Sequence, residues 1–154
     1  MRKLFVLAAL FALAVACSNE TAESKSDSAS SCKKSLNPNG DSELALLMRK
    51  LANWNDSTKA LFVKDSVLTS AQLTPPSDYN TIFTAKKTDP SIDQELFTSL
   101  ARHYASQVEQ FRTSPSDRAT QVKNFNSMVN ACVSCHENFC GGPLKRINKM
   151  FVKE

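Results

Sequence analysis

Two cysteines and a histidine near the end of the chain have the spacing of a haem-attachment motif. They form the run Cys132-Val133-Ser134-Cys135-His136. On a helix, residues at i, i+3 and i+4 share one face, so both thiols and the imidazole would point toward the same object. Thiols at this spacing can each bond one vinyl group of a haem, and the adjacent histidine can bind its iron. We therefore expect one covalent haem c, with Cys132 and Cys135 as its thioether residues and His136 as the proximal iron ligand.

The same residues allow two other interpretations. A redox-active dithiol of the thioredoxin type would accompany a βαβ pattern, which this sequence lacks. Alternatively, Cys132, Cys135, His136 and Cys140 could hold a structural zinc ion. The adjacent residues Cys135 and His136 are poorly spaced as two ligands of one tetrahedron, and the second half of a zinc-ribbon spacing is missing. Haem is therefore the favoured interpretation, and zinc is the alternative.

The N-terminus has the pattern of a bacterial export signal. Arg2 and Lys3 precede an apolar stretch over residues 4–16, which is shorter than the roughly 20 residues of a membrane-spanning helix. Small residues then lead into Cys17, as in a lipobox. We expect residues 1–16 to be a signal peptide and Cys17 to carry a lipid that anchors the protein to a membrane. Ordinary signal cleavage, with Cys17 incidental, is the alternative.

Export agrees with the haem motif, because bacterial c-type haem is attached outside the cytoplasm. The expected location is therefore the periplasm, on either the inner or the outer membrane. Residues 17–40 are polar and predict a flexible tether, followed by one domain over residues 41–154 with a short basic tail. Loss of Arg2 and Lys3 lowers the net charge from +4 to +2, and no basic run alternates with aromatic residues, so nucleic-acid binding is not expected.

The domain is expected to be all-α. A first helix should begin at Asp41 or Ser42 and carry one apolar stripe of 3–4 spacing, formed by Leu44, Leu47, Met48, Leu51, Trp54, Thr58, Leu61 and Phe62. A short second helix is indicated around Leu68 and Leu73, and another turn around Ile82. These elements, with the two helices that follow them, predict a four-helix bundle with the haem among the helices.

Two further long helices and a short tail complete the pattern. The third helix follows residues 89–91, with an inner face of Leu96, Leu100, Tyr104, Val108 and Phe111. The fourth should start with Pro115 at its first position and run to about Phe139, where Gly141 and Gly142 stop it. It would carry the C-x-x-C-H run near its end. A short amphipathic tail follows, with the basic residues Lys145, Arg146, Lys149 and Lys153.

Residues 41–140 resemble class II c-type cytochromes, the cytochrome c prime family. The shared features are the C-x-x-C-H run near the end of the last helix, an aromatic residue three positions after its histidine (Phe139), and a long first helix. The family usually has Arg or Lys at the next position, where this chain has Cys140. The resemblance implies a four-helix bundle. It also implies, for a low-spin subgroup, that a methionine of the first helix binds the iron, and Met48 stands where that methionine is expected.

The role of Met48 decides between two possible functions, electron transfer and gas binding. On the helical pattern alone it would be a core methionine, since thioethers pack well in cores. With the resemblance, Met48 is expected to be the distal iron ligand, and paired Met and His ligands favour electron transfer. An open sixth site would instead favour binding of nitric oxide or carbon monoxide. His103, the other histidine, is expected to be a half-exposed helix residue and not a ligand.

The two remaining cysteines, Cys32 and Cys140, would face an oxidising compartment, where spare thiols usually pair. In an up-down-up-down bundle the start of the first helix lies near the end of the fourth, so a Cys32–Cys140 disulfide is expected, with free or intermolecular thiols as the alternative. The basic tail is expected to be a solvated face, with a docking patch for an acidic redox partner as the alternative.

Together these features predict a membrane-anchored, periplasmic, mono-haem c-type cytochrome. It would transfer single electrons to and from redox proteins that the sequence does not identify. The alternatives are a gas-binding protein with an open sixth site and a structural zinc module. No acid–base constellation is visible, so an enzyme is not expected. Some relatives dimerise, which leaves a homodimer open.

Overall fold

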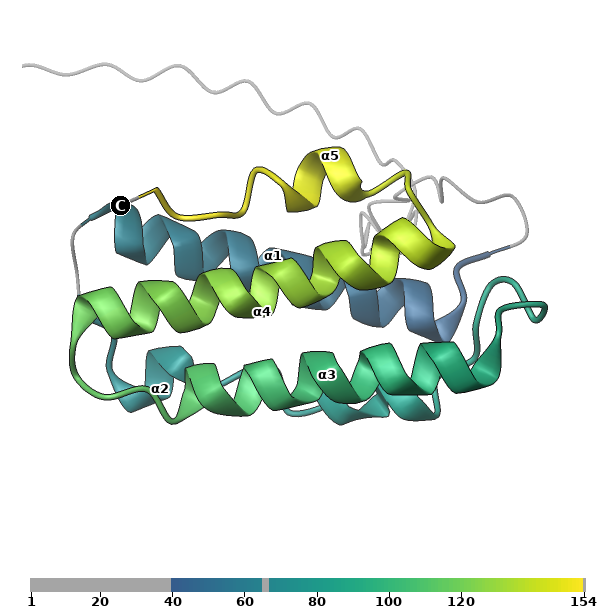
Figure 1. Cartoon of the computed structure of the whole chain (residues 1–154), viewed down its shortest axis with the longest axis horizontal. Helices are drawn as coiled ribbons and strands as arrows, with labels where there is room; N and C mark the ends of the chain where they lie inside the picture. Colours follow the sequence, from purple (N-terminus) through teal and green to yellow (C-terminus); the bar gives the residue numbers. More distant parts are fainter. Residues whose placement is uncertain (1–39, 65–66, 154) are drawn as a thin grey trace, which may run out of the picture. The chain divides into compact units, whose positions relative to one another are not determined.

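The computed structural model describes residues 40–64 and 67–153, and every regular element within them is helical. No strand occurs in these two ranges, so the expected all-α class is confirmed. Figure 1 shows the elements in order: α1 (Glu43–Val63), α2 (Ser70–Leu73), the 3-10 helix η1 (Tyr79–Phe83), α3 (Gln94–Arg112), α4 (Arg118–Phe139) and α5 (Leu144–Ile147).

Three long helices, α1, α3 and α4, dominate the described residues. In Figure 1, α1 and α3 begin at the end of the domain where α4 finishes, so α4 runs opposite to the other two. The 3-10 helix η1 packs against both α1 and α3, and α5 packs against α4. A simple four-helix bundle would have a second long helix between α1 and α3. The described part of that connection holds only α2 and η1, which match the short helix and the turn that the sequence predicted there.

Side-chain caps start each of the long helices. Ser42, Asp93 and Asp117 each accept a hydrogen bond from the backbone N–H three residues ahead, which satisfies one of the donors that a helix start leaves unpaired. The first helix therefore begins where the sequence predicted. The fourth does not begin at Pro115 as predicted. It begins at Arg118, because Asp117 provides the cap and Pro115 remains in the preceding turn.

An aromatic cluster forms the centre of the core. Phe62 of α1, Phe111 of α3 and Phe125 of α4 are completely buried, and their ring centroids lie 5.5 to 6.4 Å apart. Trp54 adds an edge-to-face contact with Phe111 at 5.9 Å. Such pairs add to the burial energy, because the positive ring edge meets the negative ring face. The cluster fixes how the three long helices pack on one another.

Removing the central ring should be costly. Phe111→Ala is expected to lower the free energy of unfolding by about 3–5 kcal/mol, because it leaves a cavity where three helices meet. Urea denaturation followed by circular dichroism would measure the loss. Phe83→Ala, which truncates a ring that is 38% exposed, serves as the matched control and should cost much less. Equal losses in the two variants would contradict the central role of Phe111.

The second half of α3 has the predicted inner face, with Tyr104, Val108 and Phe111 buried, but the inner face of the first half is rotated. Phe97, Ala101, Tyr104, Val108 and Phe111 are the buried residues of this helix. Leu96, which the sequence analysis placed inside, is 42% exposed, so that prediction is wrong. The 3–4 spacing allows either stripe, and the larger Phe97 ring occupies the interior, where it packs against Phe139 with ring centroids 5.9 Å apart.

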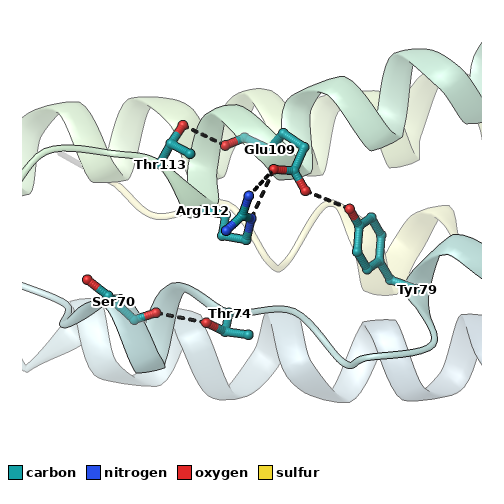
Figure 2. Close-up of polar contacts among 6 residues, drawn as sticks. All are labelled: Ser70, Thr74, Tyr79, Glu109, Arg112 and Thr113. Carbon is teal, nitrogen blue, oxygen red and sulfur yellow. Dashed lines mark hydrogen bonds and ion pairs between the residues drawn. The ribbon is translucent and has the colours of Figure 1, made fainter.

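A polar contact ties η1 to α3, as Figure 2 shows. The Tyr79 hydroxyl donates to Glu109 Oε1 at 2.6 Å, and Arg112 Nε donates to Glu109 Oε2 at 2.9 Å. The hydrogen bond from Arg112 lowers the pKa of the Glu109 carboxyl below its ordinary value, and the hydrogen bond from Tyr79 lowers it further by a smaller amount. The ionised form of this carboxylate is therefore favoured in the folded chain.

This carboxylate predicts a pH dependence of stability. A carboxyl with a lowered folded pKa stabilises the protein above its ordinary pKa of 4.5, and this contribution is lost as the pH falls through the folded value. Because the pair is largely exposed, the contribution should be at most about 1 kcal/mol. Urea titrations between pH 7 and pH 3 should show a smaller acid-induced loss in Glu109→Gln than in the parent protein. The exposed Glu137→Gln control should follow the parent curve, and a parallel curve for Glu109→Gln would refute the prediction.

Candidate haem-binding cavity

A cavity of about 510 Å³ lies among the three long helices. Its lining is mostly apolar, and its size is within the range of sites for cofactors and small molecules. The cavity is lined by parts of six segments. They are α1 (from Leu44 to Asn55), α3 (Phe97, Ala101 and Tyr104), α4 with its C-cap (Ala131, Cys132, Cys135, His136, Phe139 and Cys140), the segment around α5 (Pro143, Arg146, Ile147 and Met150), η1 (Ile82) and the loop before α3 (Thr88, Asp89 and Ile92).

The structure brings the three motif side chains to this one cavity. Cys132, Cys135 and His136 all line it from the last turns of α4. Neither thiol is in a disulfide. Burial raises the pKa of the Cys132 thiol to about 12, with a smaller contribution from neighbouring Cys135, and burial also raises the pKa of Cys135. Both thiols are therefore neutral in the folded chain, which suits their apolar surroundings.

The end of α4 orients the His136 ring. His136 Nδ1 lies 3.1 Å from the backbone oxygen of Cys140, and the Cys140 N–H donates to the His136 carbonyl at 2.9 Å. Since a carbonyl only accepts hydrogen bonds, the neutral ring carries its proton on Nδ1 and keeps the lone pair on Nε2. Metal-binding histidines are commonly held in this way. This support comes from the Cys140 backbone and not from its side chain.

Two methionines line the same cavity. Met48 lies half-buried on α1, where the family resemblance led us to expect a methionine facing the haem. Met150, after α5, is almost completely buried and also lines the cavity. No local sequence pattern indicates which part of the core the tail covers, so the position of Met150 on the cavity wall was not predictable from its neighbours in the chain. Met128 is fully buried but does not line the cavity, and His103 is exposed on α3.

The segment around α5 closes one wall of the cavity. Arg146 donates to Asp56 Oδ2 at 2.7 Å and to Asn53 Oδ1 at 2.9 Å, both on α1. Asn126 of α4 exchanges two hydrogen bonds with the backbone of Val152, each at 2.9 Å. The tail is therefore pinned to two long helices. Arg146 is exposed, as expected for a residue on a solvated face, and its exposed side chain also pairs with Asp56 of α1.

Two buried polar atoms on the cavity wall have no hydrogen-bond partner among the described residues. They are Asn55 Oδ1 and the Tyr104 hydroxyl, on residues that are 2% and 4% exposed. Burial raises the pKa of Tyr104 well above its ordinary value, and Cys132 and Tyr79 raise it further, so its hydroxyl keeps its proton. A buried polar atom without a partner is costly, and such atoms indicate that something else bonds to them.

The donor set of the cavity fits a haem better than a zinc ion. An apolar lining suits a flat macrocycle, and the cavity wall offers the two thiols of the motif, an oriented imidazole and the thioethers of Met48 and Met150, together with Cys140. By contrast, the described residues contain no group of three or more His, Cys, Asp or Glu side chains placed to hold a metal ion. The zinc alternative needs such a group on Cys132, Cys135, His136 and Cys140, and the structure does not bring these side chains together in that way.

Several predicted features lie outside the described residues. They include the signal peptide, the lipidated Cys17, the tether and Cys32. Cys140 is exposed and is not in a disulfide with any described cysteine, so its pairing with Cys32 stays a prediction. Among the helices of residues 40–64 and 67–153, none has both the length and the apolar character needed to cross a membrane.

No protein-family model, curated protein or solved structure matches this sequence.

Proposed function

We propose that this chain is a mono-haem c-type cytochrome that transfers single electrons. The observation that carries the proposal is one apolar cavity lined by both thiols and the imidazole of a C-x-x-C-H run, and by the thioether of Met48 on another helix. In this proposal Cys132 and Cys135 bond the haem covalently, and His136 Nε2 and Met48 Sδ are its iron ligands. When bound, the haem supplies a one-electron iron couple, whose potential a Met–His ligand pair raises.

The chain's own residues prepare this site. The last turns of α4 hold both thiols and the imidazole on one face, and the Cys140 carbonyl keeps Nε2 of His136 as the basic nitrogen. The apolar walls exclude water, which sets a low local dielectric and so affects the reduction potential. The pinned segment around α5 covers one side, with Ile147 and Met150 buried against the core.

The proposal includes the finer fold assignment. We assign the domain to the four-helix class of c-type cytochromes, with α2 and η1 in place of a long second helix. Support comes from the long α1 that carries Met48 and from the position of the motif near the end of α4. The short elements suffice, because η1 packs against both α1 and α3 and contributes Ile82 to the cavity wall.

The proposed cellular setting follows from the sequence. Residues 1–16 would be removed on export, Cys17 would carry the lipid, and residues 17–40 would tether the domain at the periplasmic side of a bacterial membrane. Its partners would be redox proteins, and a homodimer and the Cys32–Cys140 disulfide belong to the same proposal. Binding of nitric oxide or carbon monoxide at an open iron is the competing function, and the placement of Met48 on the cavity wall favours electron transfer over it.

An absorption spectrum tests the proposal directly. The protein would be produced in a host that attaches c-type haem, purified and reduced with dithionite. Sharp, split bands of low-spin haem are expected, because His136 and Met48 would both bind the iron. A broad high-spin spectrum would make gas binding the leading function. A protein without haem bands would refute the cytochrome proposal.

A further inference from the structure

The cavity wall is mostly apolar, but it includes two buried polar side chains. Two buried polar atoms there, Asn55 Oδ1 and the Tyr104 hydroxyl, lack a partner among the described residues. The question is therefore whether the two atoms are placed to share one small ligand.

Ring contacts show that Tyr104 lies opposite Cys132. The register of α3 against α4 is set by two ring pairs, Phe111–Phe125 at 5.5 Å and Phe97–Phe139 at 5.9 Å. Tyr104 lies midway between the two rings of α3, and Cys132 lies midway between the two rings of α4. Since the helices are antiparallel (Figure 1), these two midpoints face each other.

Asn55 belongs to the same level of the domain. Phe62 of α1 contacts Phe125 at 5.6 Å, within the same aromatic cluster. Asn55 precedes Phe62 by the same interval as Tyr104 precedes Phe111, which is about two helical turns. Because α1 and α3 run in the same direction (Figure 1), the two polar residues reach the cavity at one level, from two different helices.

We infer that Asn55 and Tyr104 form a small polar subsite, next to Cys132, that binds one uncharged molecule of the size of water. The neutral Tyr104 hydroxyl donates to this molecule, and the molecule donates to Asn55 Oδ1. Water can accept the first bond and donate the second, and buried waters typically bridge such otherwise unpaired groups. An uncharged molecule fits these two atoms, because neither the Asn55 amide nor the protonated Tyr104 hydroxyl carries a charge that could balance an ion.

The subsite goes beyond the proposed function, because the two polar atoms need a partner whichever group bonds the cysteines. A double-mutant cycle on the purified holoprotein tests it, with Tyr104→Phe, Asn55→Leu and the double variant compared by urea denaturation. Each single variant should lower the midpoint, and the double variant should lower it hardly further, because either change removes the shared molecule. Additive shifts, or a higher midpoint for Tyr104→Phe, would overturn the inference.

A matched control variant and a second measurement distinguish a shared bound molecule from other causes of lowered stability. Tyr79→Phe removes a hydroxyl that has its own partner, Glu109, so its effect should add to that of Asn55→Leu. A high-resolution crystal structure of the holoprotein should show one water within hydrogen-bond distance of both atoms. A direct bond between Asn55 and Tyr104, or two unbridged atoms, would refute the subsite. The absorption spectrum of the same sample should be recorded first, because it shows whether haem is bound and so distinguishes a failure of the subsite from a failure of the haem proposal.

Discussion

Cys132→Ala combined with Cys135→Ala is expected to abolish covalent haem attachment completely. The two thiols line the cavity beside His136 and are not in disulfides, and each would supply one of the two thioether bonds. The protein would be produced in a host that attaches c-type haem, and covalent haem would be read by haem staining of a denaturing gel. The parent protein should stain at its own mass, and the double variant should not stain.

The chain offers a matched control in its third described cysteine. Cys140 is exposed, and only its backbone supports His136, so Cys140→Ala should stain like the parent. Each single variant should keep one thioether bond and stain more weakly than the parent. A stained double variant would refute the role of the two thiols, and an unstained Cys140→Ala variant would show that the loss of stain does not report on the motif.

Met48→Leu is expected to convert the reduced haem from low spin to high spin. Leucine has a similar volume, and such exchanges usually cost less than about 1.5 kcal/mol of stability, so the domain should stay folded. The change removes only the thioether that we propose as the distal ligand. Absorption spectra should lose their sharp bands, the reduction potential should fall because a Met ligand raises it, and the reduced protein should gain binding of carbon monoxide.

Met150→Leu is the control for this experiment. Met150 also lines the cavity and is almost completely buried, so the two variants remove the same chemical group from two positions on the cavity wall. We expect Met150→Leu to keep the low-spin spectrum and the potential of the parent. The reverse outcome, in which only Met150→Leu becomes high-spin, would assign the distal ligand to Met150 and refute the assignment to Met48.

Local patterns predicted much of the secondary structure. The 3–4 spacing of apolar residues and the Ser42 cap correctly located the first helix, and the weak patterns between residues 64 and 90 correctly indicated short elements. The errors have local causes of their own. Two overlapping stripes on α3 are both compatible with the helical period, so only packing against Phe139 shows that Phe97 is inside and Leu96 outside. Likewise, Pro115 and Asp117 are both acceptable starts for α4, and the hydrogen bond made by Asp117 selects the second.

Some residues of the candidate site could likewise be predicted from the sequence, whereas others were placed only by the tertiary structure. Cys132, Cys135 and His136 were evident from the sequence, because positions i, i+3 and i+4 of one helix share a face whatever surrounds them. Met150, Asn55 and the Arg146 contact with Asp56 depend on segments that are distant in the chain. Helical spacing gives the direction in which a side chain points from its own axis, but not which other helix it meets. Packing of the Phe62, Phe111 and Phe125 rings sets that register, and it is the register that brings the thiols, the thioethers and the two unpaired polar atoms to one cavity.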